Sequence, residues 1–399
     1  MADPAKIFYK NPYFDGQLAR TLAVATVDAA DLGETMATAR RVGKLNGQSW
    51  FDAWSNTADV ARKTGDVALQ SGDRVSARNA FLRASEYWRQ AFYFVRANLD
   101  DPRLQRGYGA HVDTFGAALE LLDIPAEKVQ IPYEDTTVVG YFFAPADDGQ
   151  VRPTLVFPCG YDSTAEAGWG NVAPAVERGY NALVFEGPGQ GEALYTQRLF
   201  FRHDFEHVLS PVLDWLATRP EVDPARVGLI GRSFGGYLAP RAAAFEHRIA
   251  ALVCDPAQPD MAARLPGGFI GKVATPVVNV QTRVSESRAE FFGARMAAHG
   301  IDSISRYFAE LRRFTMLDDA KQITCPTLII EADKDFAGGS GQELADAMVA
   351  QTELVHLTEA QGAEGHCAGL GQEVWASVVY GWLQKVLPTT TIAADAHRS

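Results

Sequence analysis

The chain has 399 residues, of which 47% are hydrophobic and 22% are charged. This ordinary globular composition excludes a disordered protein, and the length suits two or three domains, or one large domain with a cap. No apolar run reaches the roughly 18 residues that a bilayer span needs, which excludes a transmembrane protein. The net charge of −12 disfavours nucleic acid or an anionic membrane as a partner.

The N-terminus and the cysteines predict a cytoplasmic location. Met1–Tyr13 has no basic segment followed by an apolar one, so we expect no secretory signal. The four cysteines lack a CxxC spacing, which disfavours a zinc knuckle or a disulfide framework and fits a reducing compartment. They are Cys159, Cys254, Cys325 and Cys367.

Residues 1–125 are predicted to form an N-terminal helical cap domain. Alanine and aromatic residues recur there at spacings of three and four, the pattern of amphipathic helices with a wide apolar face. Gly65 and Gly72 are expected to interrupt this pattern. The expected helices lie at residues 28–42, around 50–61 and at 74–96.

From residue 126 to residue 399, short β-rich runs alternate with helical stretches. Most of the later runs are almost continuously apolar, as strands covered on both faces must be. Such alternation predicts a mostly parallel sheet, and eight strands with an antiparallel start follow the plan of the α/β-hydrolase fold. The expected strands are 128–133, 137–143, 154–158, 180–186, 226–231, 249–255, 326–331 and 353–358, and the expected helices are 166–178, 203–219, 234–247, 342–351 and 372–387.

One interval of this catalytic domain is too long for a simple crossover. About 65 residues, approximately 256–320, separate two of the expected strands. We therefore expect a helical lid insertion there. Its aromatic residues would form the lid core first and a substrate wall second; they are Phe291, Phe292, Tyr307, Phe308 and Phe314.

The segment Gly231–Gly236 reads GRSFGG and lies between an apolar strand and a helix. This is the G-x-S-x-G nucleophile elbow in its strand–turn–helix context. The glycines suit a tight turn whose neighbours pack against bare backbone. Ser233 would project at a helix N-terminus, where backbone N–H groups favour developing negative charge. Ser233 is therefore the expected nucleophile.

A serine nucleophile needs a base and an orienting acid, which in this fold follow it in the order acid, then histidine. After the next-to-last strand, Asp335 follows the turn and is the expected acid, with Asp333 as the alternative. His366, in the loop after the last strand, is the expected base. His356 falls within that strand and is expected to be packed or structural.

An oxyanion hole needs two N–H donors, and two backbone positions can supply them. Phe234 follows the nucleophile and is the expected first donor. The second donor is expected in the loop Pro158–Ser163, where Gly160 permits a sharp turn and Tyr161 is the favoured backbone amide. Asp162 is expected to cap the helix that follows.

Two other motifs suggest different chemistry. Gly187–Gly191 resembles a phosphate loop but lacks the G-x-G-x-x-G spacing, so a tight turn beside the active site is favoured. His203–His207 matches H-x-x-E-H, the inverted zinc-peptidase pattern, and its two histidines would share a helix face. A third protein ligand is not identifiable, so no metal and no cofactor are expected.

The combination of PCGYDSTAE, FEGPGQGE, GRSFGG and a late GHC resembles the α/β-hydrolase family that contains 2,6-dihydroxypseudooxynicotine hydrolase and the fungal heptaketide-pigment (yellowish-green) hydrolases. The resemblance covers most of residues 130–387, and the helical N-terminal region fits the same plan. It implies Ser233, Asp335 and His366 as the triad and a homodimer with an N-terminal helical cap. Several members hydrolyse carbon–carbon bonds next to ketones, whereas related proteins act as esterases or peptidases.

We therefore expect a serine hydrolase that cleaves a carbon–carbon bond next to a ketone, or an acyl bond, in an aromatic or polyketide-like small molecule. His366 would protonate a carbanion leaving group, or in a variant would activate water without an acyl-serine. A carboxylesterase, amidase or acyltransferase with the same triad remains open. The alternative of a different class is a non-catalytic ligand-binding protein, which would not need the complete triad.

Overall fold

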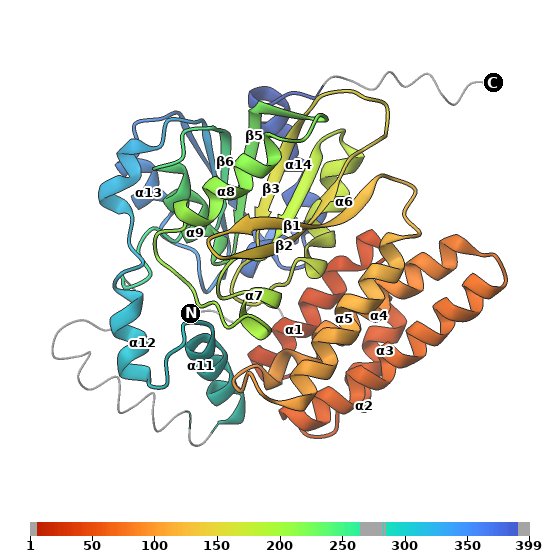
Figure 1. The fold of residues 1–399 in the computed structure, drawn as a ribbon. Helices are drawn as coiled ribbons and strands as arrows, with labels where there is room; N and C mark the ends of the chain where they lie inside the picture. Colours follow the sequence, from red (N-terminus) through yellow and green to blue (C-terminus); the bar gives the residue numbers. More distant parts are fainter. Residues whose placement is uncertain (1–5, 264–281, 283–284, 390–399) are drawn as a thin grey trace.

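The computed structural model describes residues 6–263, 282 and 285–389 and is built around one eight-stranded sheet (Figure 1). The strand order is β1-β2-β4-β3-β5-β6-β7-β8; β2 runs antiparallel to β1 and β4, and the other pairs are parallel. The predicted fold is thus confirmed. The strands are β1 (Ala126–Tyr133), β2 (Thr136–Phe143), β3 (Arg152–Pro158), β4 (Asn181–Phe185), β5 (Val222–Arg232), β6 (Ile249–Asp255), β7 (Thr327–Ala332) and β8 (Thr352–Leu357).

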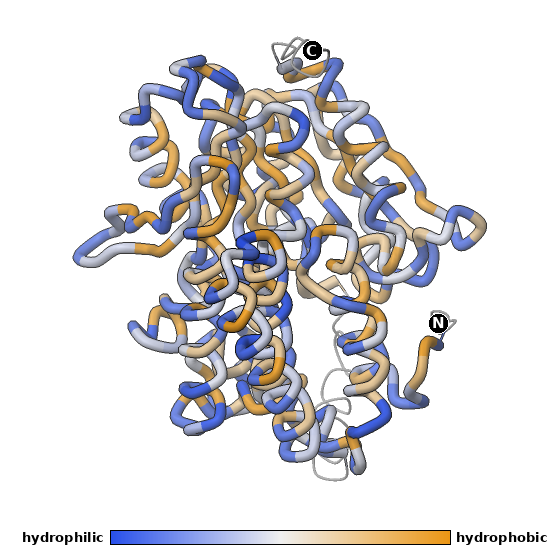
Figure 2. Tube along the Cα trace, turned by 90° about the vertical axis from the view of Figure 1, so that its right-hand side faces the viewer, coloured by the Kyte–Doolittle hydropathy of each residue, from blue (hydrophilic) through white to orange (hydrophobic). Residues whose placement is uncertain are grey.

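Helices cover both faces of the sheet, which explains the continuous apolar runs. Every residue of β3, β4 and β7 is buried. Hydrophobic residues follow the strands through the interior of this layer (Figure 2). On one face lie α6 (Trp169–Glu177) and α14 (Gln372–Val386); on the other lie α8 (Glu206–Leu216), α9 (Gly235–Ala243) and α13 (Gly341–Ala347).

The N-terminal region forms a helical layer beside the sheet (Figure 1). Its core is aromatic, with Phe14, Trp50, Trp54 and Tyr87 almost fully buried. The sequence patterns missed α1 and α5, although each begins with a capping Asn or Asp followed by proline. The helices are α1 (Pro12–Ala23), α2 (Leu32–Arg41), α3 (Gly47–Gln70), α4 (Arg74–Phe92) and α5 (Pro102–Leu119).

The expected interruption at Gly65 is wrong, because α3 continues through it to Gln70. A Cβ atom at Gly65 would overlap the ring of Phe81, so this glycine allows α3 and α4 to pack closely. Gly72 adopts φ +84° just beyond the end of α3 and does interrupt the helical pattern.

The interval between β6 and β7 contains α11 (Glu286–Ala298) and α12 (Ile304–Leu311). Residues 264–281 and 283–284 of the expected insertion lie outside the described residues. Tyr307 and Phe314 are buried, as expected of an insertion core, whereas Phe291, Phe292 and Phe308 are only half-buried. Phe291 contacts Tyr13 of α1, with ring centroids 5.3 Å apart. The described part of the insertion therefore packs on the N-terminal helices.

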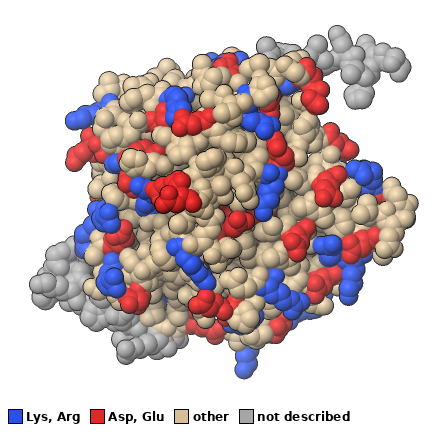
Figure 3. All heavy atoms as spheres, viewed as in Figure 1, with Lys and Arg blue, Asp and Glu red and all other residues tan. Residues whose placement is uncertain are grey.

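Charged side chains of both signs lie on the surface. On the face seen in Figure 3, acidic and basic side chains are interspersed, and no broad basic area suitable for a polyanion is visible there. Among the helices of the described ranges, none is both long and apolar enough to cross a bilayer.

Candidate active site

The turn between β5 and α9 has the strained geometry expected of a nucleophile elbow. Ser233 adopts φ +57°, a left-handed conformation that costs a non-glycine residue about 1–3 kcal/mol. A Cβ at Gly231 would overlap the carbonyl oxygen of Gly235, and one at Gly236 would overlap that of Pro256. At Gly235 the nearest atom would be 3.8 Å away. The turn therefore demands glycine at 231 and 236 but not at 235.

The three residues predicted as a triad lie together in one hydrogen-bonded chain. Ser233 Oγ is 2.8 Å from His366 Nε2, and His366 Nδ1 is 2.8 Å from Asp335 Oδ1. The Asp335 side chain is only 1% exposed and also accepts hydrogen bonds from the backbone N–H groups of Ala337 and Cys367. Three donors therefore hold this carboxylate, and the imidazole is oriented with Nε2 toward the serine.

Asp333, the alternative acid, contacts groups other than His366. Its Oδ1 lies 2.8 Å from His356 Nε2, and its Oδ2 accepts a hydrogen bond from the Glu359 backbone N–H at 2.8 Å. The His356 side chain is 55% exposed at the edge of the sheet, so it is not packed, and its contact with Asp333 fits the other part of the expectation, a structural role. Asp333 and His356 form a surface pair that fixes the turn after β8.

The charges around the imidazole favour its protonated form. Burial works to lower the pKa of His366, but electrostatic interactions with Cys367 and Asp335 outweigh it and hold this pKa well above its ordinary value. Burial likewise works to raise the pKa of Asp335, yet the His366 charge and the three hydrogen bonds keep it below its ordinary value. Asp335 is therefore ionised where it can stabilise an imidazolium.

Arg232, which sequence reasoning missed, ties the elbow to the histidine loop. Its Nη2 donates to the Cys367 carbonyl at 2.7 Å, and its Nε donates to Asp255 Oδ2 at 3.0 Å. The guanidinium lies over the Trp375 ring, 4.3 Å from its centroid. Asp255 in turn accepts the Ser233 backbone N–H at 2.7 Å through its carbonyl. The signal that could have revealed this role is the position of Arg232, a charged residue next to the nucleophile at the end of a buried strand.

The loop after β3 lies against the elbow, as the oxyanion-hole prediction requires. A Cβ at Gly160 would lie 3.5 Å from the Phe234 backbone nitrogen. The Tyr161 ring stacks on the Phe234 ring with centroids 4.0 Å apart. Within the described part of the chain, the backbone N–H groups of Phe234 and Tyr161 make no hydrogen bond. Both donors are thus available to an oxyanion.

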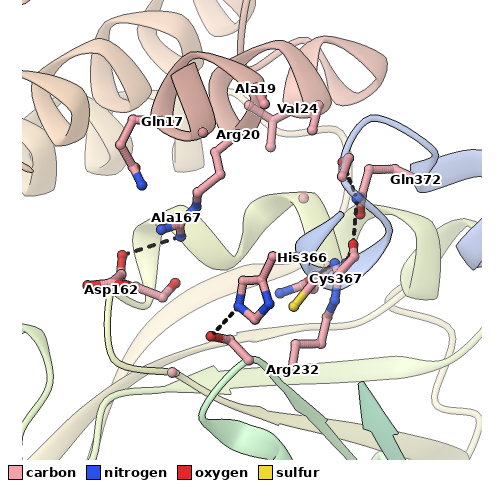
Figure 4. Close-up of a pocket in the computed structure, with 18 of the residues that line it drawn as sticks. Gln17, Ala19, Arg20, Val24, Asp162, Ala167, Arg232, His366, Cys367 and Gln372 are labelled. Carbon is pink, nitrogen blue, oxygen red and sulfur yellow. Dashed lines mark hydrogen bonds between the residues drawn. The ribbon is translucent and has the colours of Figure 1, made fainter. Parts of the chain in front are cut away.

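Asp162 does not serve mainly as a helix cap, because three arginines surround it. Arg96 donates to its Oδ1 at 2.8 Å, and Arg295 of α11 donates to its Oδ2 at 3.2 Å. Arg20 of α1 donates to its carbonyl at 3.3 Å (Figure 4). Burial works to raise the pKa of Asp162, but the charges of these arginines depress it strongly. The oxyanion loop is therefore fixed from both the N-terminal helices and the insertion.

A cavity of about 1530 Å³ opens onto these groups. Ser233, Gly160 and His366 form part of its wall, and so do aromatic residues of the N-terminal helices and the insertion, including Tyr13 and Phe291. Phe291 thus lines the cavity, as a substrate-wall role would require. The cavity is large enough for a multi-ring small molecule, since ligand pockets typically measure about 300–1,000 Å³.

The two competing motifs have structural explanations. In Gly187–Gly191, the Gly189 backbone N–H donates to the Leu199 carbonyl, the Gly187 N–H donates to the Gln190 side chain, and the Gln190 N–H donates to the Gly187 carbonyl. These three donors are therefore not available to a phosphate. The helix prediction from His203 is wrong because α8 begins at Glu206, so the two histidines do not share a helix face. Glu206 pairs with Arg241 at 2.6 Å instead of facing a metal.

Family models match two long parts of the chain. Residues 154–375 match the Alpha/beta hydrolase family, and residues 22–259 match the model described as Esterase FrsA-like. The second match includes most of the N-terminal helices together with the elbow. The resemblance inferred from the sequence motifs is thereby confirmed.

Similar proteins cover nearly the whole molecule. Hydrolase acrC of Aspergillus aculeatus is 34% identical over 82% of this chain and 84% of its own length. The 20-hydroxy-prefusarin hydrolase FUS2 of Gibberella moniliformis is 30% identical, again over 82% and 84%. Among solved structures, 2,6-dihydroxy-pseudo-oxynicotine hydrolase has a TM-score of 0.74 at 21% identity, covering 92% of this chain and 95% of its own. That likeness shows a shared fold, N-terminal helices included.

Proposed function

The chain belongs to the α/β-hydrolase family, and from that premise we propose that it is a serine hydrolase that cleaves a carbon–carbon bond next to a ketone in an aromatic or polyketide-like small molecule. The observation that carries the proposal is the unbroken chain from Ser233 Oγ through His366 to Asp335, with both links 2.8 Å long. A serine at its free pKa is a weak nucleophile, and this arrangement supplies the base that it needs.

The proposed reaction has two halves. His366 Nε2 accepts the Ser233 Oγ proton while the oxygen attacks the substrate carbonyl, and the backbone amides of Phe234 and Tyr161 bind the resulting oxyanion. The carbonyl re-forms as the carbon–carbon bond breaks, and His366 returns its proton to the carbanion that leaves. Water, deprotonated by His366, then releases the acyl group from the serine. Asp335 stabilises the imidazolium in both halves.

Two observations support the substrate class. Aromatic side chains from the N-terminal helices and from α11 wall the cavity, which suits an apolar ring system. The relative FUS2 is named as a hydrolase of a single compound, 20-hydroxy-prefusarin. We extend that kind of substrate, though not that compound, to this chain.

An ester or amide hydrolase is the second candidate, favoured by the match to the Esterase FrsA-like model. The same residues would act, with an alkoxide or amine as leaving group. Acyl transfer would result if a second substrate replaced water. A route in which His366 activates water directly would spare the acyl-serine. A non-catalytic ligand-binding role would leave the hydrogen-bonded serine, histidine and aspartate without a purpose.

The test combines product analysis with one substitution. The wild-type protein is assayed by mass spectrometry on a panel of aryl esters and aryl β-diketones, which distinguishes the two bond types. Ser233→Ala is expected to lower turnover by about 10⁴ or more, because only binding and the oxyanion hole would remain. Its melting temperature should match that of the wild type. Near-normal turnover by the folded variant would overturn the proposal.

Three further expectations belong with this proposal. We propose that residues 1–125 act as a cap on a catalytic domain of residues 126–399, with about 256–320 as its lid, that the protein is a homodimer, and that it is cytoplasmic. The four cysteines are free thiols in the structure, as a reducing compartment would favour. Light scattering coupled to size-exclusion chromatography measures the mass of the assembly.

A further inference from the structure

We propose that the substrate carries an oxyanion close to its scissile carbonyl, either a carboxylate or the enolate of a 1,3-dicarbonyl, and that Arg20 binds it. The inference rests on the proposed function, because it takes the cavity at Ser233 to be the substrate site. It adds a charge requirement that the aromatic walls alone do not suggest.

The first argument is the charge balance around the oxyanion loop. Three guanidinium groups, those of Arg20, Arg96 and Arg295, converge on Asp162. One further carboxylate, Glu290, accepts the backbone N–H groups of Arg96 and Ala97 at 2.6 and 2.9 Å. Even with both carboxylates ionised, this cluster keeps one excess positive charge. Excess charge is costly in a largely buried site unless a counter-charge accompanies it.

The nearby pair of Glu86 and Arg89 does not supply that counter-charge. Both Arg89 Nε and Arg89 Nη2 donate to the Glu86 carboxylate at 2.7 Å, so the pair is internally neutral. Burial lowers the pKa of the Arg20 guanidinium, and the Arg89 charge lowers it further, against the weaker opposing effects of Tyr93, Asp162 and Glu86. The surroundings of Arg20 are therefore short of negative charge.

The second argument is that Arg20 has donors to spare. Arg96 also donates to the Tyr93 carbonyl at 2.9 Å, and Arg295 stacks on the Phe291 ring at 3.6 Å from its centroid. Arg20 makes one hydrogen bond within the described residues, a 3.3 Å contact with the Asp162 carbonyl. A guanidinium has five N–H donors in a planar fork that matches a carboxylate or a dicarbonyl enolate. Most of that fork is open to a ligand.

The third argument is position. Arg20 extends from α1 toward Asp162 (Figure 4). It lines the same cavity as Ser233 and His366. The carbonyl that it contacts belongs to Asp162, the residue next to Tyr161, whose backbone N–H is the proposed oxyanion donor. An anion held by Arg20 would therefore lie in the same cavity as the carbonyl that Ser233 attacks, beside the loop that carries the proposed oxyanion donor.

The test measures binding rather than turnover, in a Ser233→Ala background. Two pairs of probes are compared by calorimetry at neutral pH and low ionic strength: benzoate with benzamide, and the enolate of triacetic acid lactone with its neutral O-methyl ether. We expect at least one anion to bind about tenfold or more tightly than its neutral partner, the range of a charge-assisted hydrogen bond. The pair that shows this preference identifies the anionic group.

Variants assign the preference to Arg20. Arg20→Gln in the same background should reduce it to less than about threefold, whereas Arg20→Lys should retain part of it because the charge remains. Arg306→Gln is the matched control, because it removes an exposed arginine of α12 that pairs with Asp302. It should leave the preference for the anion unchanged. Melting temperatures show whether each variant is folded.

Two results would overturn the inference. One is equal affinity for anion and neutral partner in both pairs, including no binding by any probe. The other is an undiminished preference in Arg20→Gln. Neither result bears on hydrolysis, which the comparison of wild type with Ser233→Ala decides separately, so the two proposals can fail independently.

Discussion

Replacing Asp335 by asparagine changes one atom and tests the whole hydrogen-bonded chain. The Asp335 carboxylate receives only donors: His366 Nδ1 at 2.8 Å, the Ala337 N–H at 2.8 Å and the Cys367 N–H at 3.3 Å. An amide must direct its own NH₂ group at one of them. If that group faces His366, the imidazole carries its proton on Nε2 and cannot accept the Ser233 proton. If it faces Cys367, the tautomer survives but the negative charge is lost.

The size of the effect follows from these two orientations. In a related triad, the same exchange cost about 10⁴ in turnover through the wrong tautomer, which corresponds to about 5 kcal/mol of transition-state stabilisation. Because Oδ1 of Asp335 accepts two of the three donors, the asparagine carbonyl is favoured at that position, and part of the tautomer effect is avoided. We therefore expect Asp335→Asn to lose at least about a thousandfold in kcat.

Asp333→Asn is the matched control. Asp333 differs from Asp335 by two positions, has a side chain that is 39% exposed, and contacts His356 and the Glu359 backbone instead of His366. Its amide variant should lose less than about tenfold. The assay is steady-state turnover of the panel compound that the wild type hydrolyses, with melting temperature as the measure of folding. If Asp333→Asn proves the more damaging, or if both variants remain active, the assignment of the acid is refuted.

The remaining predictions concern the elbow, the base and metals. Gly236→Ala should abolish activity or folding, because its Cβ would overlap the Pro256 carbonyl oxygen. Gly235→Ala should be tolerated, because its Cβ would have room. Equal effects of the two variants in activity and melting assays would contradict this reading. His366 must be neutral to act as the base, and its pKa is raised above the ordinary 6.5. We therefore expect kcat/KM to rise with pH through a midpoint above 6.5. A midpoint below about 6 would contradict the role of His366 as the base. Dialysis against a chelator should leave turnover unchanged, because His366 and two amides supply the base and the electrophile; loss of activity restored by zinc would point to a metal mechanism.

The strands and the proposed triad were predictable because their signals are local. An apolar run before GRSFGG specifies the elbow, and the order of acid and histidine after it follows from the fold. The boundaries of Gln342–Gln351 and Phe234–His247 were less accurate, since the helices end earlier at Ala347 and Ala243. Helix ends depend on capping contacts that periodicity does not report.

The arginine cluster was not predictable from any single segment. Arg20, Arg96 and Arg295 come from parts of the chain separated by up to 275 positions, and each lies in a stretch where a charged residue normally faces water. Only the packing of α1, the turn after α4 and α11 around Asp162 brings them together. Gly65 was misread for a similar reason, because its neighbour Phe81 lies on another helix.

The hydrogen bonds and ion pair that hold α11 restrict the conformational changes open to this enzyme. Glu290 accepts the N–H groups of Arg96 and Ala97, Glu286 accepts that of Gly47 at 3.0 Å, and Arg295 completes the ring of charge around Asp162. Swinging α11 outward alone would strip a buried ion pair of one partner, at a cost of about 3–5 kcal/mol. If substrate enters the cavity, we therefore expect it to do so without an outward movement of α11. A shortened enzyme that lacks the N-terminal helices would leave Asp162 without Arg20 and Arg96, two of its three arginines. A protein shortened in this way would therefore lose part of the wall of the cavity that Ser233 lines.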